Sequence, residues 1–182
     1  RFDLPDAVKA AYSDEVDVTS CFRPRNGADP TVGAGAATRY ASWVGPELPT
    51  EALVSMDIDL AADTKSLGLL LRTSDDTEDG YALRLEPDRT RLVLDRWPRG
   101  STGTEQWQIL GDVPHAVELE RAVQLAPGRH RVDVHLDGDV CVAVVDGGVA
   151  LSTRLYDRAA GRAGLFVQDG AFTLERLTIR TR

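Results

Sequence analysis

The sequence has 182 residues, of which 42% are hydrophobic and 27% are charged, and this length suits one domain with a real core, or at most two small ones. The formal net charge of −8 argues against nucleic acid as a partner, because phosphates attract a basic face. No apolar run approaches the roughly 20 residues of a membrane span, so no membrane partner is expected. Residue 1 is Arg and the first residues lack the pattern of a signal peptide, so we expect a processed piece of a longer protein, whose extracellular or cytoplasmic location stays open.

One short helix is predicted at the start of the chain. Asp3 suits its N-cap, Pro5 suits an early helical position, and the AVKAAY stretch that follows is helix-prone. We assign residues 1–35 to this helix, a linker and a first strand, and residues 36–182 to a β-sandwich domain.

Period-two patterns dominate the rest of the sequence. Alternation of this kind turns one face of a strand toward a core and the other toward solvent. The apolar positions are Val54, Met56, Ile58 and Leu60 in one segment, Tyr81, Leu83 and Leu85 in a second, Leu92 and Leu94 in a third, and Val132, Val134 and Leu136 in a fourth.

Turn signals separate these segments at short intervals. Asp137-Gly138 and Asp146-Gly147-Gly148 suit tight hairpins because their residues tolerate a positive φ. The change of parity at Glu175-Arg176 predicts a β-bulge. About a dozen strands with few helices predict an all-β fold, an antiparallel two-sheet β-sandwich.

No catalytic residue is expected. Ser152 lacks the glycines of a nucleophile elbow, and the three histidines lie in neither a triad setting nor a metal-binding spacing. Asp57 and Asp59 share a strand face, which is similar to the carboxylate strand of jelly-roll glucanases, but the flanking Glu pair of that motif is missing. A stand-alone hydrolase therefore requires a further carboxylate pair facing a cleft.

Metal and redox chemistry have little support. Asp75, Asp76, Glu78 and Asp79 offer oxygen ligands for a structural Ca²⁺, but without EF-hand spacing, so an acidic loop without metal is favoured and no cofactor is expected. Cys141 alternates with apolar residues and is expected to be a buried free thiol, although a disulfide with Cys21 stays open.

Aromatic residues are the better functional signal. Sugar binding uses flat aromatic faces against the ring and polar groups against the hydroxyls. Trp97, together with Asp95 and Arg96, is the best such constellation, whereas Trp43 and Trp107 taken singly are expected to pack.

Several segments resemble the C-terminal β-sandwich of glycoside hydrolase family 32, the family of invertases, levanases and inulinases. They cover under half of the chain and are LDRWP (Leu94–Pro98), VELERAV (Val117–Val123), the segment Val132–Asp157 and GLFVQDG (Gly164–Gly170). Upstream, GLLLRTSDD and GYALRLE resemble the concanavalin-like pattern of many sugar-binding modules. The resemblance implies a concanavalin- or lectin-like jelly roll.

In that family, catalysis resides in a five-bladed propeller that precedes the sandwich. Its Asn-Asp-Pro-Asn, Arg-Asp-Pro and Glu-Cys motifs do not occur here, so no catalytic residue of the family maps onto this chain. The resemblance implies a non-catalytic accessory domain whose partners are a catalytic propeller and a fructan- or sucrose-type sugar.

Related sandwiches grip a terminal fructosyl unit through Arg and carboxylate contacts, and the resemblance makes five residues the candidates here. They are Arg72, Tyr81, Asp95, Trp97 and Asp169. Arg72 offers a fork of donors to adjacent hydroxyls, although it can equally pair with Asp75 or Glu78, and Asp169 can equally make a turn.

Two functions therefore stay open. The first is a module that binds fructosyl chain ends, which requires an aromatic and charged cluster on one concave sheet face. The second is a scaffold that stabilises the propeller and binds no sugar, which an exposed apolar patch would favour.

Overall fold

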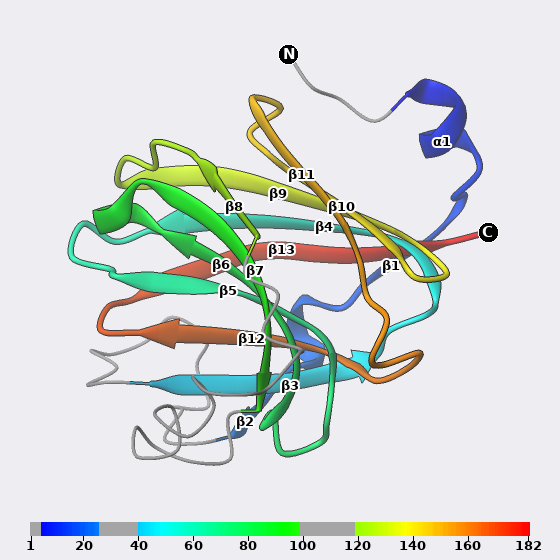
Figure 1. Cartoon of the computed structure of the whole chain (residues 1–182), viewed down its shortest axis with the longest axis horizontal. Helices are drawn as coiled ribbons and strands as arrows, with labels where there is room; N and C mark the ends of the chain where they lie inside the picture. Colours follow the sequence, from blue (N-terminus) through cyan, green and yellow to red (C-terminus); the bar gives the residue numbers. More distant parts are fainter. Residues whose placement is uncertain (1–4, 26–39, 99–118) are drawn as a thin grey trace.

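The structure, a computed structural model, describes residues 5–25, 40–98 and 119–182. In this part of the chain, two antiparallel sheets pack face to face, and one short helix, α1 (Asp6–Ala10), lies at the N-terminal end (Figure 1). The predicted all-β sandwich with a short N-terminal helix is confirmed.

Each sheet mixes strands from distant parts of the sequence. The six-stranded sheet has the order β1 (Asp14–Asp17), β13 (Phe172–Thr181), β4 (Glu51–Leu60), β9 (Gly128–Asp137), β10 (Val140–Val145) and β11 (Val149–Arg154). The seven-stranded sheet has the order β2 (Arg23–Arg25), β3 (Ala41–Glu47), β12 (Arg162–Gln168), β5 (Ser66–Thr73), β6 (Asp79–Glu86), β7 (Arg91–Pro98) and β8 (Leu119–Ala122). Two 3₁₀ turns, η1 (Thr19–Cys21) and η2 (Pro87–Arg89), connect strands.

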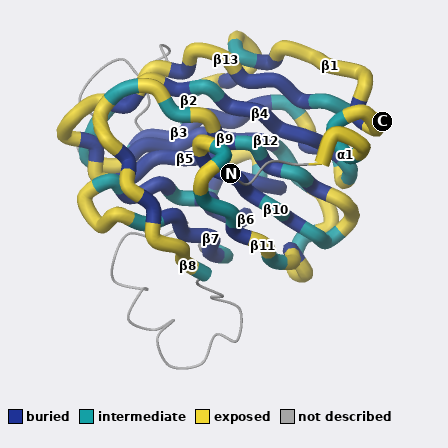
Figure 2. The backbone as a smooth tube through the Cα atoms, turned by 90° about the horizontal axis from the view of Figure 1, so that it is seen from above, coloured by how far each residue is buried: buried dark blue, intermediate teal, exposed yellow. Residues whose placement is uncertain are grey.

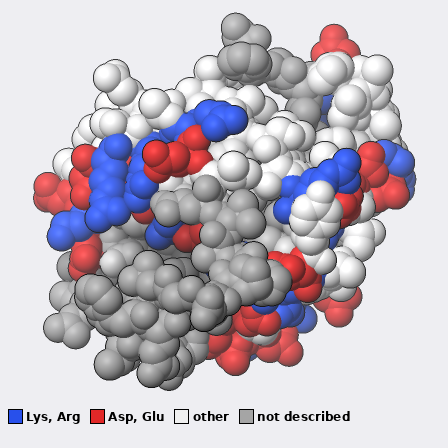
Figure 3. All heavy atoms as spheres, in the orientation of Figure 1, with Lys and Arg blue, Asp and Glu red and all other residues white. Residues whose placement is uncertain are grey.

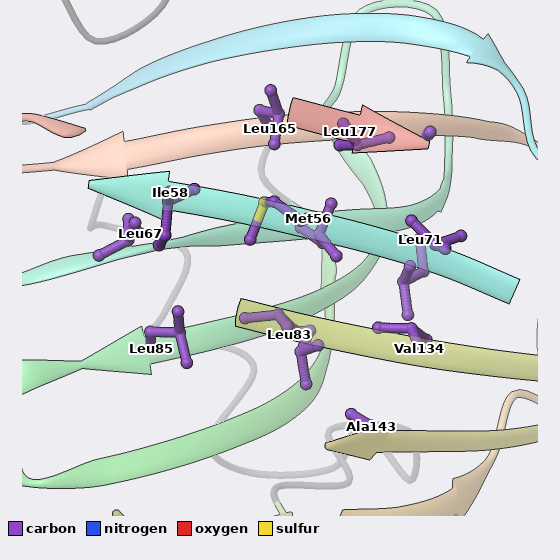
Figure 4. Packing of buried hydrophobic residues seen from close by; sticks show 14 of the residues in the cluster. Met56, Ile58, Leu67, Leu71, Leu83, Leu85, Val134, Ala143, Leu165 and Leu177 are labelled. Carbon is purple, nitrogen blue, oxygen red and sulfur yellow. The ribbon is translucent and has the colours of Figure 1, made fainter. Parts of the chain in front are cut away.

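The core lies between the two sheets and consists of the predicted alternating residues. Met56 and Ile58 of β4 face Leu67, Leu83 and other leucines of the opposite sheet (Figure 4). All apolar positions predicted from the four alternating segments are buried. Figure 2 shows buried segments running through both sheets, with exposed residues concentrated at the turns. Burial of this apolar surface is the main force that holds the sheets together.

The predicted turns and the predicted bulge are also confirmed. Gly138 and Asp146 both have positive φ, +57° and +51°, at the β9–β10 and β10–β11 hairpins. In the pairing of β13 with β4, Leu174 opposes Ile58 and Arg176 opposes Asp57, so Glu175 is the extra residue of a bulge.

The N-terminal segment joins both sheets. β1 pairs with β13 and β2 pairs with β3, while α1 begins after Pro5 with no side-chain cap. Asp3, predicted to cap the helix, lies outside the described residues, and the division at residue 35 stays a prediction. In the described ranges, no helix combines the length and hydropathy needed to cross a membrane.

Candidate functional site

The outward face of the seven-stranded sheet carries a chain of charged side chains across β6, β7 and β8. We call Arg84, Glu86, Arg91, Asp95 and Glu120 the outer-face cluster. Positive and negative groups alternate along it, and Figure 3 shows Lys or Arg side by side with Asp or Glu on the face of the molecule that it draws. The contacts are Arg84 Nη2 to Asp95 Oδ2 at 2.8 Å, Arg84 Nη1 to Glu86 Oε1 at 3.5 Å, Arg91 Nε to Glu86 Oε2 at 2.6 Å and Arg91 Nη1 to Glu120 Oε2 at 2.6 Å.

The register explains why these groups meet. Ala82 lies opposite Asp95, and Glu86 lies opposite Arg91, so alternate residues of both strands point away from the core. The side chains of Asp95 and Glu86 are only 8% and 5% exposed. Buried carboxylates are costly unless they are paired, so the cluster holds two desolvated acceptors beside guanidinium donors.

Small and aromatic residues flank the charged groups. Gly68 lies opposite Arg84 on one side and opposite Phe166 on the other. A Cβ at Gly68 would lie 1.9 Å from the Leu83 carbonyl oxygen. The close approach of β5 to β6 therefore requires glycine at this position, which lies between Phe166 and Arg84. Tyr40 stacks on Phe166 with ring centroids 6.0 Å apart. Aromatic and charged groups therefore share one sheet face.

Ser66 adds a buried hydroxyl to this face. It follows the same alternation as Gly68 and Leu70 along β5, and it lies one residue beyond the Leu67–Leu85 pair, next to Glu86. Its Oγ is buried and has no hydrogen-bond partner within the described structure. A hydroxyl that is desolvated without compensation costs free energy, and a ligand or water is the usual partner of such a group.

A second charged group lies at one end of the sandwich. We call Asp79, Tyr81, Arg96, Asp157 and Arg158 the rim cluster. Arg96 Nη1 and Arg158 Nη1 each donate to one oxygen of Asp79, and the Arg96 guanidinium lies 5.7 Å from the centroid of the Tyr81 ring. The backbone N–H of Asp157 donates to Tyr81 Oη at 2.7 Å. Burial, partly offset by that hydrogen bond, raises the pKa of Tyr81 above its usual value.

Arg72 lies inside the sandwich, next to the rim cluster. Its residue is 1% exposed, and its guanidinium donates to the backbone carbonyls of Gly138, Leu155 and Arg158. Burial lowers the pKa of Arg72 but leaves the group charged, because an Arg pKa lies far above neutrality. A bulge explains the inward direction: Arg162 pairs with Thr73 and Gly164 with Leu70, so Leu71 and Arg72 together oppose Ala163.

The five residues predicted to contact sugar are thus placed in different environments. Asp95 belongs to the outer-face cluster, Tyr81 belongs to the rim cluster, and Arg72 contacts backbone carbonyls rather than Asp75 or Glu78. The backbone of Trp97 pairs with Gly80, and its side chain lies outside the described part. Asp169 has a positive φ in the β12–β13 turn and lies 3.9 Å from Lys65 Nζ. Their contact with a sugar stays a prediction.

Sequence reasoning missed Arg84, Glu86, Ser66 and Arg158. A signal existed for the first two, because they alternate with Leu83 and Leu85 in GYALRLE and so had to lie on the outward face. Arg158 had none, since its partner Asp79 lies far away in the sequence.

Other candidate groups serve local structure. His130 Nδ1 lies 2.7 Å from Asp146 Oδ2 and its Nε2 lies 2.6 Å from the Ala126 oxygen, while His135 Nε2 lies 2.9 Å from Tyr12 Oη. Both cysteines are free, with Cys21 exposed and Cys141 buried, and burial raises the pKa of Cys141 to about 12. The expected buried free thiol is confirmed.

The acidic loop before β6 is held by its own hydrogen bonds. Ser74 Oγ and the Glu78 N–H donate to Asp76 Oδ1, and these bonds together with the charge of Arg158 lower the pKa of Asp76. Within the described ranges, no three or more His, Cys, Asp or Glu side chains are grouped to hold a metal ion. Trp43 packs in the core, 2% exposed, as expected, while Trp107 and His115 lie outside the described residues.

Comparison with known proteins shows the fold. No protein-family model and no curated protein matches the sequence. The carbohydrate-binding module CBM66 of Bacillus subtilis superimposes with a TM-score of 0.71 at 13% identity, over 90% of this chain and 97% of the module. Toad ovary galectin, solved with thio-digalactose, gives a TM-score of 0.56 at 12% identity, over 79% of this chain and 99% of the galectin.

A longer enzyme contains the same fold as one of its parts. The sucrose-6-phosphate hydrolase of Lactobacillus gasseri gives a TM-score of 0.56 at 13% identity, over 97% of this chain and 29% of the enzyme. This chain thus spans less than a third of that enzyme's length. Together these neighbours establish a lectin-like β-sandwich, and at such low identities they establish the fold alone.

Proposed function

We propose that this chain is a non-catalytic carbohydrate-binding β-sandwich that accompanies a fructan- or sucrose-cleaving glycoside hydrolase, and that its outer-face cluster binds β-fructosyl chain ends. The observation that carries the proposal is the combination, on one sheet face, of the Arg84–Asp95 pair with the stacked rings of Tyr40 and Phe166. Phe166 is fully buried and Tyr40 is partly exposed, so Tyr40 and the charged pair are the groups that can meet a sugar, and aromatic and charged groups together are what sugar recognition uses.

The chemistry of the cluster matches a sugar with neighbouring hydroxyls. Each hydroxyl both donates and accepts, so it can accept from the Arg84 guanidinium while it donates to Asp95 or Glu86. Low exposure of both carboxylates strengthens such hydrogen bonds, because the surrounding dielectric is low. Gly68 contributes no side chain between Phe166 and Arg84, which lie on either side of it in the sheet. The alternating charges of the cluster favour a neutral ligand.

The comparisons support this proposal at the level of the fold. A module whose name states carbohydrate binding has nearly the same length and the same architecture as this chain. Because the identity is 13%, the choice of a fructosyl ligand depends on the outer-face cluster and on the sequence resemblance, not on the superposition.

A purely structural role is the second candidate. It is supported by the match to 29% of a longer hydrolase, in which such a sandwich is one part of a larger enzyme. In this case the chain would pack on a catalytic β-propeller and bind no sugar. Among the described residues, the large apolar side chains with high exposure are Val16 at 58% and Tyr156 at 74%. They lie on β1 and in the β11–β12 connection, so they do not form the continuous patch expected of a packing surface.

Isothermal titration of the chain with levan, inulin, fructose and sucrose tests the proposal. We expect saturable heat with a fructan or with fructose, and a loss of roughly 10-fold or more in affinity in Asp95→Asn. Asp57→Asn is the matched control, because Asp57 also lies on an outward sheet face beside an arginine, 3.4 Å from Arg131 Nη1. The control should bind normally. Folding of each variant is checked by thermal unfolding.

Absence of heat with all four sugars, in a protein that melts cooperatively, would exclude the binding function and leave the structural role. Heat that survives unchanged in Asp95→Asn would keep the function but remove the outer-face cluster as its site.

A further inference from the structure

The β5–β6 and β11–β12 connections lie at one end of the sandwich (Figure 1), and two of the five non-glycine residues with positive φ in the described structure are found there. Arg72 and Thr77 both have positive φ, +54° and +65°, which is unfavourable for side chains other than Gly and especially for a β-branched residue. A Cβ at Gly80 would lie 2.8 Å from Thr73 Cα, and one at Gly161 would lie 2.4 Å from the Arg72 carbonyl carbon. The two connections are therefore closely packed, and part of the β5–β6 backbone is strained.

A buried positive charge lies at the same end. Arg72 is among the largest fully buried side chains in the described structure, and the acceptors of its guanidinium there are backbone carbonyl oxygens, while its buried Nε has no hydrogen-bond partner in the described residues. A buried guanidinium costs free energy, so its retention needs a compensating role. Its contacts identify that role, because they fix the β9–β10 turn through Gly138 and the β11–β12 connection through Arg158.

The group that Arg72 fixes is the rim cluster. Its Arg96 and Arg158 side chains are 18% and 23% exposed, and Asp79 and Asp157 are 42% and 34% exposed. Both guanidinium groups converge on Asp79, while the Nε atoms of Arg96 and Arg158 are buried, and Arg96 Nε lies 3.7 Å from Asp157 Oδ2. The partly exposed carboxylates of Asp79 and Asp157 therefore lie beside the less exposed guanidinium groups of Arg96 and Arg158, backed by the Tyr81 ring.

The charges around the cluster restrict the class of ligand. The carboxylates of Asp79, Asp157 and the nearby Asp76 disfavour an anionic ligand. The guanidinium groups of Arg96 and Arg158, with the buried Arg72 behind them, disfavour a cationic one. A neutral ligand with adjacent hydroxyls satisfies both kinds of group, because each hydroxyl donates and accepts. We propose that the rim cluster is a second saccharide-binding site, separate from the outer-face cluster and positioned by Arg72.

The two sites lie on opposite sides of the same sheet. Asp95 and Arg96 are neighbours in β7, and successive residues of a strand point to opposite faces. Asp95 points outward to Arg84, whereas Arg96 lies over Tyr81, which belongs to the core-facing row. One chain could therefore hold two sugar units at once. A polymer with many chain ends would then bind more tightly than a single unit, because the second contact is intramolecular.

Titration with a short fructo-oligosaccharide tests this inference, which takes only its class of ligand from the proposed function. We expect two sites per chain in the unaltered protein and one in Arg158→Gln. This variant keeps the Arg158 carbonyl that Arg72 needs, so the fold should persist. Arg154→Gln is the matched control, because Arg154 lies at the end of β11, pairs with Asp139 at 2.8 Å and should leave two sites.

Asp95→Asn gives the complementary result, in which the rim site remains and the outer-face site is weakened by roughly 10-fold or more. Arg72→Lys tests the positioning role. It should weaken only the rim site, and levan should lose affinity more than a monosaccharide does.

A single site per chain that Asp95→Asn abolishes and Arg158→Gln leaves intact would overturn the rim site while the proposed function stands. A single site lost in Arg158→Gln alone would support the rim site and remove the outer-face cluster. Absence of binding in every titration would overturn both proposals.

Discussion

The outward faces of the two sheets carry the same residue types in different environments. On the six-stranded sheet, Arg131 bridges Asp57 and Asp133 with side chains that are 49%, 33% and 25% exposed. On the seven-stranded sheet, Asp95 and Glu86 are 8% and 5% exposed. Solvated ion pairs contribute little to stability, whereas desolvated ones must be satisfied. The difference shows that burial, rather than the presence of Arg–carboxylate pairs, separates the candidate binding face from an ordinary polar face.

The largest effect that this comparison predicts is on stability. Asp95→Ala removes a carboxylate from a desolvated pair and leaves Arg84 with a poorer partner, so we expect a loss of about 2–4 kcal/mol. Asp57→Ala should cost less than about 1 kcal/mol. Urea unfolding of both variants at one pH measures the difference. Equal losses would show that the two faces do not differ electrostatically.

A second effect concerns the floor of the outer-face cluster. Gly68→Ala forces the Leu83 carbonyl to move, since the new Cβ would lie 1.9 Å from it, and overpacking of this kind costs roughly 2–3 kcal/mol. In Gly138→Ala, in the β9–β10 turn of the six-stranded sheet, the new Cβ meets no atom within 4 Å. The loss of stability then comes only from the positive φ of +57°, and it should be about 1 kcal/mol. Thermal unfolding ranks the two, and the reverse order would contradict the close approach of β5 and β6.

The sequence predicted most of the fold because the core is built from local alternation. Val54, Met56 and Ile58 share a face whatever their neighbours are, so period two alone assigned them to the core. The same rule separates Tyr81 from Asp95. Tyr81 alternates with Leu83 toward the core, while Asp95 follows the core residue Leu94 and points outward, so their convergence on one face was not to be expected.

The position of Arg72 could not be derived in this way. Its inward direction depends on the bulge opposite Ala163 and on the carbonyl of Gly138, and both partners are remote in the sequence. The pairing of Arg158 with Asp79 depends likewise on how two connections meet in space. Local patterns therefore predicted the sheets, and tertiary contacts determined the candidate sites.

Ser66→Ala separates binding from stability on the seven-stranded face. Its hydroxyl has no partner in the described structure, so its removal should leave the free energy of unfolding unchanged or raise it by up to about 1 kcal/mol. If a sugar hydroxyl bonds to Ser66 Oγ, affinity for the fructosyl ligand should fall by about 5-fold. Ser55→Ala is the control, because Ser55 Oγ donates to Asp133 at 2.6 Å on the other sheet. That change should reduce stability and leave binding unaltered.

The smallest predicted effect is pH dependence, and it arises in the six-stranded sheet. His130 has an acceptor at each ring nitrogen, Asp146 and the Ala126 carbonyl, so only the protonated ring satisfies both. Burial lowers the pKa of His130, but these hydrogen bonds and the Asp146 charge outweigh it and raise the pKa. The stabilisation is therefore complete below the unfolded-state pKa of about 6.5 and is lost as pH rises through the folded-state value.

His135 acts in the opposite direction on the same strand. Burial lowers its pKa and outweighs the opposing charge of Asp137, with a smaller contribution from Arg182 in the same direction as burial. The folded state therefore favours the neutral ring and loses stability as pH falls below about 6.5. Urea unfolding from pH 5.5 to 8 should show that His130→Gln removes a gain on acidification, on the order of 1 kcal/mol, and that His135→Gln removes a loss. Because both histidines belong to β9, sugar affinity on the seven-stranded face should stay constant over this range. An affinity that follows either titration would show that the two sheets are coupled, and the contrast between their outward faces would no longer suffice to assign the binding site.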